Sequence, residues 1–376
     1  MPEVIEINDI DELEHYWLVW NALLTETPGA SFFHSLDWLT TYWKHFGHRQ
    51  KLRVLVVYSR GIPVGIVPLT VICERTRVGR IRTLTYPLHD WGSFYGPIGP
   101  NPTATLTAAM QYLREIYRDW DLLDLRWVDR ERHDVGRTRN AMRHAGWQGC
   151  ESVWKETAVI DMTQSWEDYF ASRTSKFRNN VRRAGKRVRE AGKVSFERHR
   201  PLSAAEGDGD PRWDLYEQCI EVARQSWQGS STNGTTLSHD SVSEFFHEAH
   251  ALAAKAGAVD LCLLRLDGQP VAFAYNYHRD GRVFGLRAGF DAHSAPPGTG
   301  TVLLQHVFQD SFERGDHLFD MASGFEKAKR FWMTHIERSY RYTHYNVTSP
   351  RVQILRLKHW LRKRQQISNL SKATAV

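Results

Sequence analysis

A run of three short apolar segments, separated by two tight-turn signals, constrains this chain more than any other feature of its sequence. The turn signals are Asp267-Gly268 and Asp280-Gly281, and apolar, aromatic and β-branched residues flank both of them. This pattern is typical of consecutive antiparallel hairpins. Residues 259–290 are therefore predicted to form three antiparallel strands.

The third predicted strand runs into a turn rich in glycine and proline, DAHSAPPGTG, at residues 291–300. Apolar residues then recur at helical spacing, so a helix begins close to this turn. Glycine allows the backbone to approach a ligand closely, and the unpaired amides at a helix start attract phosphate or another anion. The predicted anion-binding residues are Gly298, Thr299, Gly300 and Thr301.

The length and composition are those of a globular protein with room for two domains. The chain has 376 residues, of which 41% are hydrophobic and 24% are charged. No apolar run reaches membrane-spanning length and the N-terminal segment is acidic, so a cytoplasmic location is predicted.

No metal site is expected. The four cysteines are widely scattered without metal-ligand spacing, and they are predicted to be free, buried thiols. His247 and His250 lack the spacing of a zinc-binding helix, and we assign them to a helix surface.

The net charge of +6 is concentrated in two segments. Residues 173–193 contain nine Lys or Arg and one Glu, and residues 351–364 contain six Lys or Arg and no acid, so the rest of the chain is acidic. Any attraction to a polyanion therefore belongs to these two segments.

Residues 173–193 fit an amphipathic helix with one narrow apolar stripe. The stripe consists of Phe177, Val181, Ala184, Val188 and Ala191. A charged helix face is most often merely solvated, but such a face usually mixes charges of both signs, and this one is almost purely basic. We expect the helix to face phosphate groups, with contacts from Arg178, Arg182 and Arg183.

The order of predicted elements in the second half of the chain repeats that of the first half. Residues 61–65 correspond to residues 268–272, and residues 122–125 correspond to residues 318–321. Two hairpins can share a turn motif by chance, but the matching order favours an internal duplication of one α/β unit. A boundary is expected between residues 149 and 166.

The Gly-x-Gly turn and the segment LFDMASGFEKAKRFW at residues 318–332 resemble the acyl-CoA site of the GNAT acyltransferases. More narrowly, they resemble the BioF2-like acetyltransferases (CelD/BcsL type) of cellulose and exopolysaccharide biosynthesis, which are related to the FemAB aminoacyltransferases. The resemblance covers about residues 30–345. It implies tandem GNAT-like α/β units, each with a mixed, mainly antiparallel sheet flanked by helices. It also implies acetyl-CoA or another acyl-CoA as co-substrate, without a metal.

Only the second predicted unit retains the Gly-x-Gly turn. Residues 92–97 of the first unit form an aromatic loop instead, which would crowd a pyrophosphate. Residues 156–350 are therefore expected to bind the donor, and residues 1–155 are expected to form a wall of the acceptor cleft without binding it. Residues 351–376 are assigned to a basic C-terminal helix and tail.

Acyl transfer to an amine requires a base for the amine proton and an acid for the leaving thiolate. Asp320 and Glu326 are the candidate bases nearest the predicted cleft, and Tyr342 is the candidate acid, with Tyr340 and Tyr345 as alternatives. The structural alternatives are that Asp320 caps a turn, that Glu326 pairs with a nearby lysine, and that the tyrosines belong to the core.

Three further residues are candidates for substrate binding. Lys329 suits an acceptor carboxylate or phosphate, unless it pairs with Glu326. Arg287 alternates with apolar neighbours on the third strand and faces either the cleft or solvent. Trp227 lies in a polar loop that could fold over an acceptor, although core packing explains most of the tryptophans.

The C-terminal basic segment combines Ile354, Leu357 and Leu361 with its six cations. We expect a terminal helix that packs on the domain with its basic face in water. The alternative is peripheral contact with an anionic membrane surface.

These features predict an acyl-CoA-dependent N-acyltransferase. The resemblance suggests an amino sugar or another amine of polysaccharide or cell-envelope metabolism as acceptor. One alternative is a FemAB-like transferase that uses aminoacyl-tRNA, and only this alternative involves nucleic acid, since the basic helix carries no aromatic residue for base stacking other than the inward-facing Phe177. The other alternative is a non-catalytic accessory protein of polysaccharide synthesis.

Overall fold

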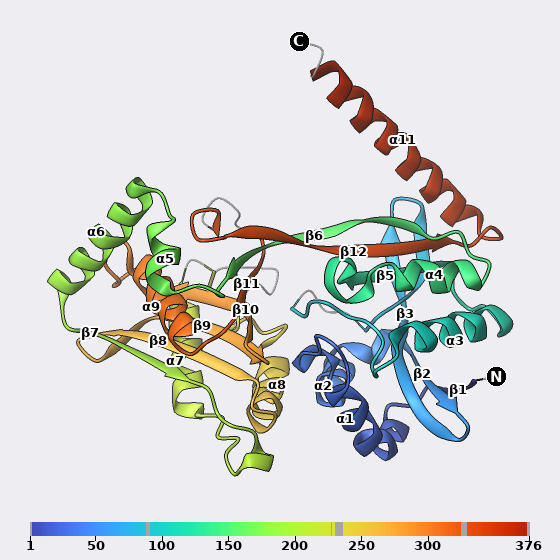
Figure 1. Ribbon diagram of the computed structural model, residues 1–376, viewed down its shortest axis with the longest axis horizontal. Helices are drawn as coiled ribbons and strands as arrows, with labels where there is room; N and C mark the ends of the chain where they lie inside the picture. The colour runs from blue at the N-terminus through green and yellow to red at the C-terminus, as the bar shows by residue number, and fades with distance from the viewer. Residues whose placement is uncertain (1, 88–90, 227, 230–235, 325–328, 374–376) are drawn as a thin grey trace. The chain divides into compact units, whose positions relative to one another are not determined.

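The computed structural model describes residues 2–87, 91–226, 228–229, 236–324 and 329–373, with the backbone alone for residues 362–373. The chain forms two units (Figure 1). The first comprises Met1–Lys155 and Arg338–Val376, and the second comprises Glu156–Glu337. Because both boundaries fall inside strands, β6 and β12, the chain passes between the units twice within a strand.

The first unit is built on a mixed sheet with the strand order β1-β2-β3-β4-β5-β12. Neighbouring strands are antiparallel except for β4 and β5, which are parallel, with Thr83 opposite Leu122. The strands are β1 (Glu3–Ile7), β2 (Lys51–Ser59), β3 (Ile62–Thr76), β4 (Gly79–Thr85), β5 (Leu122–Val128) and β12 (His335–Tyr345). The α-helices are α1 (Trp17–Thr25), α2 (Leu36–Phe46), α3 (Pro102–Glu115), α4 (Arg137–His144) and α11 (Pro350–Ala373).

The second unit contains a sheet with the strand order β6-β11-β10-β9-β8-β7. Here β10 and β11 are the parallel pair, with Val283 opposite Phe319. The strands are β6 (Cys150–Asp161), β7 (Val194–His199), β8 (Val259–Leu266), β9 (Gln269–Arg279), β10 (Arg282–Phe290) and β11 (Leu318–Ser323). The α-helices are α5 (Trp166–Ala171), α6 (Ser175–Ala191), α7 (Trp213–Gln225), α8 (Ser243–Lys255) and α9 (Thr299–Glu313).

The same order of elements recurs in both units. Three antiparallel strands, β2–β4 or β8–β10, are followed by a helix, α3 or α9, and then by a strand parallel to the third, β5 or β11. The predicted fold class is confirmed: a mixed, mainly antiparallel sheet is flanked by helices in each unit. The three strands predicted at residues 259–290 are β8, β9 and β10.

The two-unit division differs from the predicted one at its C-terminal end. Residues 338–350 were expected in the second unit, whereas the structure places them in the first. The reason is that β12 pairs with β5, with Tyr340 opposite Val128 and Tyr345 opposite Leu122. The other division, after Lys155, lies within the interval that the sequence indicated.

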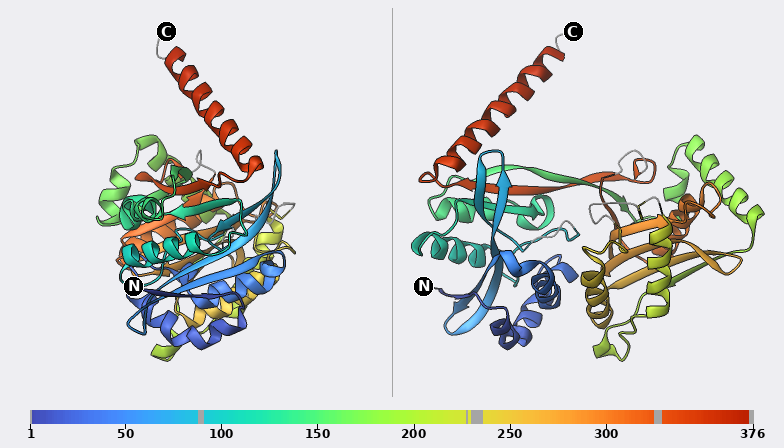
Figure 2. Two further views of the ribbon diagram at one scale, coloured as in Figure 1. Left: turned by 90° about the vertical axis from the view of Figure 1, so that its right-hand side faces the viewer. Right: turned by 180° about the vertical axis from the view of Figure 1, so that it is seen from behind.

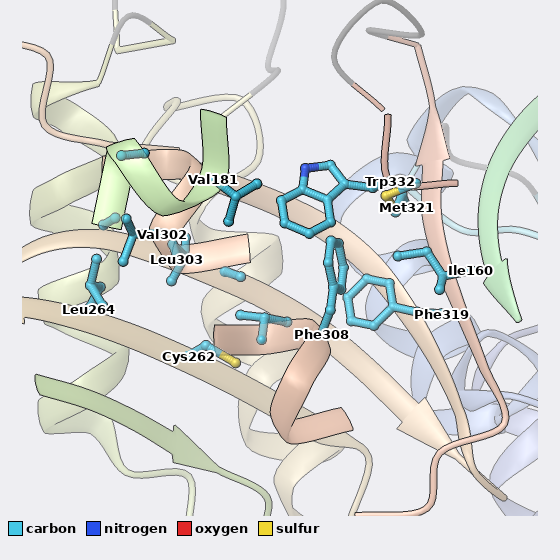
Figure 3. Packing of buried hydrophobic residues seen from close by; sticks show 14 of the residues in the cluster. Ile160, Val181, Cys262, Leu264, Val302, Leu303, Phe308, Phe319, Met321 and Trp332 are labelled. Carbon is cyan, nitrogen blue, oxygen red and sulfur yellow. The ribbon is translucent and has the colours of Figure 1, made fainter. Parts of the chain in front are cut away.

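The core of the second unit joins α6 and α9 to the sheet (Figure 3). Phe308 of α9 makes edge-on ring contacts with Phe319 of β11 and with Trp332, at centroid distances of 5.0 and 5.1 Å. The predicted stripe of α6 faces this core, with the exception of Ala191, which is exposed at the helix end. The buried residues of the stripe are Phe177, Val181, Ala184 and Val188.

Two expectations about individual residues were wrong. Cys73 and Cys150 are exposed rather than buried, although Cys219 and Cys262 are buried free thiols. His250 is not on a helix surface but fully buried, because it stacks on the ring of Tyr216 in the core of the second unit.

Within the described residues, none of the helices is both long enough and apolar enough to cross a lipid bilayer.

Candidate functional site

The parallel strands β10 and β11 separate along their length. In the part of the chain that the structure describes, they pair only through residues 282–284 of β10 and residues 318–320 of β11. Just beyond these pairs, the register of β10 against β9 shifts between Gly285 and Arg287, and that of β11 against β6 shifts between Asp320 and Ser323. Among the described residues, the last part of β10 therefore has no strand partner on the β11 side, and its backbone groups face a gap in the sheet.

Asp320 and Lys329 both stabilise the irregular end of β11. Ala322 adopts a left-handed conformation with φ of +60°, which is strained for a residue other than glycine. Its N–H donates to Oδ1 of Asp320 at 2.8 Å. The Nζ of Lys329 donates to the carbonyl oxygens of Ala322 and Ser323 at 3.0 and 3.2 Å. The predicted base and the predicted acceptor-binding lysine thus lie together at one bulge, beside the gap between the strands.

The Gly-x-Gly turn lies at the end of the loop between β10 and α9 and opens this helix. Gly298 is the N-cap residue, with φ of +104°, a conformation that favours glycine. A Cβ atom on Gly298 would lie 2.8 Å from Cβ of Ala184, and one on Gly300 would lie 3.1 Å from the ring of Phe290. The turn is therefore packed tightly against both α6 and the end of β10.

The backbone N–H groups in the first turn of α9 differ in their partners. The N–H groups of Thr299 and Thr301 donate to the carbonyl oxygens of Pro296 and Gly298, at 3.1 and 2.9 Å. The N–H of Gly300 has no acceptor among the described residues. Since α9 has 15 residues, its dipole adds positive potential at this end, as an anion site requires.

The basic helix α6 has two different flanks beside its buried stripe. Arg178 and Arg182 lie on one flank. The guanidinium of Arg178 donates to the carbonyl oxygens of Ala171 and Arg173, and that of Arg182 donates to Oδ1 of Asn179 at 3.2 Å. These two arginines, which the sequence assigned to phosphate binding, are thus engaged with their own helix and with the end of α5.

The other flank of α6 carries cations that have no side-chain partner among the described residues. Lys176, Asn180, Arg183 and Arg187 follow the spacing i, i+4, i+7 and i+11, which places them on one side of the helix. None of the four makes a side-chain hydrogen bond or ion pair within the described part of the chain. Nη2 of Arg187 lies 3.6 Å from the Cβ position of Gly298, so this flank borders the Gly-x-Gly turn.

Lys176, Asn180 and Arg187 were not among the predicted site residues. The signal that would have identified them is their periodicity with Arg183, which was predicted, along one edge of the apolar stripe. Arg183 is the one predicted arginine that lies on this flank.

A buried ion cluster fixes α9 to the sheet beneath it. Arg198 of β7 forms ion pairs with Asp260 of β8 at 2.6 Å and with Asp310 of α9 at 3.0 Å. Burial alone would raise the pKa of Asp260, but Arg198 and Arg200 outweigh it and hold this pKa well below its usual range. The cluster therefore remains ionised and attaches the C-terminal half of α9 to β7 and β8.

The remaining predicted residues are dispersed. Arg287 is half-buried on β10 and donates to the carbonyl oxygen of Leu286 at 2.6 Å. Glu326 and Trp227 lie outside the described residues.

The candidate acid Tyr342 belongs to the first unit. It is fully buried, and its hydroxyl donates to Oδ2 of Asp134 at 3.2 Å. Burial, followed by the negative charge of Asp134, raises its pKa above the ordinary value. Tyr340 donates to Glu131 at 2.8 Å, and the hydroxyl of Tyr345 is hydrogen-bonded to His359 at 2.9 Å. These contacts give all three tyrosines a structural role in the first unit.

The described residues contain no group of three or more His, Cys, Asp or Glu side chains arranged to hold a metal ion.

The family comparison agrees with the geometry of the second unit. Residues 175–330 match the family model described as an acetyltransferase (GNAT) domain. This segment begins at α6 and ends after β11, so it contains the basic helix, the strand gap and the Gly-x-Gly turn. This part of the chain is thus similar to a GNAT acetyltransferase domain, in line with the resemblance seen in the sequence, and the match supports a transferase.

Three solved structures share the fold over nearly the whole chain. FemX is 12% identical, with a TM-score of 0.59, and the match covers 92% of this chain and 97% of that one. L-PGS from Bacillus licheniformis is 17% identical, with a TM-score of 0.56 and coverages of 94% and 97%. The C-terminal domain (DUF2156) of a protein designated lysylphosphatidylglycerol synthetase, from Agrobacterium fabrum, is 12% identical, with a TM-score of 0.55 and coverages of 92% and 95%. No curated protein sequence matches the chain.

Proposed function

We propose that the protein is an acyl-CoA-dependent N-acyltransferase whose donor binds to the second unit. The observation that carries this proposal is the contact between the Gly-x-Gly turn and the unpaired flank of α6. A free N–H at Gly300, a helix N-terminus and the guanidinium of Arg187 meet there. Such a combination suits the diphosphate of a coenzyme A ester.

The gap between β10 and β11 is the proposed position of the acyl-bearing arm. Its free β10 backbone groups can pair with the amides of an extended ligand, as an added strand would. The thioester carbonyl then lies near the bulge of β11. In the reaction, the amine nitrogen forms a bond to the acyl carbon, the carbon–sulfur bond breaks, and the thiolate takes up a proton while the amine loses one.

Asp320 has a positioning role in this proposal. Its carboxylate accepts the N–H of Ala322 and so holds the strained bulge, and Lys329 holds the same bulge through two carbonyl oxygens. Glu326 remains the candidate base, and Arg287 and Trp227 remain candidates for acceptor binding. The proposed acceptor is an amine of polysaccharide or cell-envelope metabolism, and it rests on the resemblance to BioF2-like acetyltransferases alone.

A second candidate is transfer from aminoacyl-tRNA. The shared fold with FemX and the unpaired cations of α6 favour it, because an RNA backbone would neutralise the same flank. This candidate predicts binding that weakens steeply with salt and a requirement for charged tRNA. A non-catalytic accessory protein would show no turnover with either donor.

The deciding experiment is thermal unfolding of the full chain with acetyl-CoA, longer acyl-CoAs and free CoA. A ligand that binds only the folded state raises the melting temperature, and at about 100 times the Kd it stabilises by about 2.7 kcal/mol. We expect a shift with acyl-CoA and with free CoA, since the diphosphate is common to both. No shift at saturating concentration would overturn the proposal and favour the tRNA-dependent alternative, provided that charged tRNA does bind.

A further inference from the structure

A pocket of about 680 Å³ lies in the first unit, at the junction of β4, β5 and the start of α11. Four arginines and one aspartate are among its lining residues, together with Trp120. The arginines are Arg80, Arg82, Arg118 and Arg351. The volume is within the range of small-molecule binding sites, and the pocket has a strong excess of positive charge.

One of the four arginines is neutralised inside the pocket. Arg82 forms an ion pair with Asp121, with Nη2 to Oδ1 at 3.1 Å and Nε to Oδ2 at 3.2 Å. The other three have no carboxylate partner among the described residues. Arg118 lies over the ring of Trp120 at 4.8 Å, and Arg351 donates only to the carbonyl oxygen of Arg80, at 3.4 Å.

Trp120, which also lines the pocket, has a polar group without a partner among the described residues. It is 1% exposed, and its indole N–H is buried without an acceptor in the described part of the chain. Such a group costs free energy unless an acceptor is bound. Thr348 and Ser349 also line the pocket at the N-terminus of α11, where the hydroxyl of Thr348 donates to Oδ1 of Asn346 at 2.9 Å and that of Ser349 is hydrogen-bonded to Asp121. The donors that this lining offers are therefore mainly its guanidinium groups, and its one carboxylate is already paired with Arg82.

The helix α11 begins at this pocket and packs on the unit by one narrow face. Val352 is fully buried against Ile81, Leu122 and Tyr345, with Leu355 beside it. Beyond this short contact the helix extends away from the end of β12 (Figure 2).

The opposite face of α11 is apolar and exposed. Ile354, Leu357, Trp360 and Leu361 are 49%, 55%, 47% and 47% exposed. The expectation that these apolar residues pack on the domain was therefore wrong. The spacing between Pro350, Ile354, Leu357 and Leu361 is 4, 3 and 4 residues. This spacing places these four residues on one side of the helix. Because Pro350 lines the pocket, the apolar face and the pocket are continuous.

Basic residues border this apolar face. Arg351, Arg356 and Lys358 lie on the described part of the helix, and the sequence continues with Arg362, Lys363 and Arg364. Apolar residues at helical spacing with cations beside them are the pattern of a helix that lies in the interface of an anionic bilayer.

We propose that this surface of the first unit binds an anionic phospholipid membrane. The three unpaired guanidinium groups of the pocket hold a lipid phosphate group, and the apolar face of α11 enters the interface next to it. A membrane lipid accounts for both the cationic pocket and the apolar face of α11. A soluble phosphate compound would bind the pocket but leave the apolar face in water. The proposal does not depend on the chemistry of the second unit.

Vesicle flotation of the full chain tests the proposal. The probes are phosphatidylcholine vesicles with and without about 30 mol % phosphatidylglycerol, at two salt concentrations. We expect binding to the anionic vesicles only, weakened by salt. Replacing two pocket cations, in Arg80→Ala with Arg351→Ala, should reduce partitioning about 30-fold, and Leu357→Ser with Trp360→Ser should reduce it to a similar extent.

The matched control is Arg60→Ala with Arg139→Ala. It removes two exposed cations of the same unit outside the pocket, and it should change partitioning less than threefold or so. All the substituted side chains are at least partly exposed, and circular dichroism of each variant checks that it folds. Equal loss in the pocket and control variants, or no binding to anionic vesicles, overturns the proposal. A melting-temperature increase with glycerol phosphate, without vesicle binding, overturns the lipid assignment and identifies a soluble phosphate ligand instead.

Discussion

The Cβ atom of Ala184 on α6 lies 2.8 Å from the position that a Cβ atom would take on Gly298, at the start of α9. Two local sequence signals, a basic amphipathic helix and a Gly-x-Gly turn, therefore meet in one place. Gly298 is required there for two reasons, since its φ of +104° disfavours a side chain and Ala184 leaves no room for one.

The first prediction concerns this contact. Gly298→Ala should destabilise the second unit by about 2–4 kcal/mol, because backbone strain and overlap with Ala184 add together. Gly315→Ala is the matched control: its φ is +78° and no atom lies within 4 Å of its Cβ position, so it should cost only about 1 kcal/mol. Urea unfolding measures both. Equal costs, or no recovery in Gly298→Ala combined with Ala184→Gly, would contradict the role of the contact.

A second prediction separates the two flanks of α6. Arg183→Ala with Arg187→Ala should weaken acyl-CoA binding about 100-fold, because two charge-assisted contacts to phosphate are lost. Arg182→Ala with Lys186→Ala removes the same charge from the same helix away from the Gly-x-Gly turn, and it should weaken binding less than about threefold. Isothermal titration calorimetry gives both affinities. If the two pairs behave alike, the helix acts only through its overall charge.

The third prediction concerns Asp320. Asn retains an oxygen that can accept the N–H of Ala322, so Asp320→Asn should keep kcat/KM within about threefold, whereas Asp320→Ala should lower it tenfold or more as the bulge relaxes. The pH–rate profile of the Asn variant should match that of the wild type. A loss of about 100-fold or more in Asp320→Asn, with a lost acidic limb in the profile, would show instead that this carboxylate is the base.

A fourth prediction concerns His250 and pH. Its Nε2–H donates to the carbonyl oxygen of Pro211 at 2.6 Å, and Nδ1 accepts from the hydroxyl of Tyr275 at 3.2 Å, so the neutral ring satisfies both contacts. Burial lowers its pKa to about 4. The unfolded chain, with an ordinary histidine pKa near 6.5, therefore binds the proton first as pH falls.

The contribution of neutral His250 to the free energy of unfolding is fully present above about pH 6.5. It is lost as the pH falls from about 6.5 to about 4. From pH 7 to pH 5 the loss should be about 2 kcal/mol, measured as the free energy of unfolding of the second unit. His250→Gln should be less stable at pH 7 but show a smaller decrease toward pH 5. An unchanged pH dependence in this variant would assign the acid sensitivity to other groups.

The sequence by itself determined the elements whose cause is local. The turns at Asp267-Gly268 and Asp280-Gly281 predict β8–β10, because such turns match the twist of antiparallel strands. The spacing of Phe177, Val181 and Ala184 predicts the buried face of α6, because a helix repeats every 3.6 residues. The class of fold follows from the order of these elements.

Only the tertiary structure decided which residues meet. Pairing of β12 with β5 places Tyr342 in the first unit, beside residues that lie more than 200 positions earlier in the sequence. The approach of α9 to α6 places the flank with Arg187 and Arg183 beside the Gly-x-Gly turn. Arg178 and Arg182 lie on the other flank of the same helix and bond to nearby residues instead. Leu357 is likewise exposed because only a short part of α11 packs on the first unit. Local periodicity determines which way a side chain faces on its own element, but packing between distant elements determines what it faces.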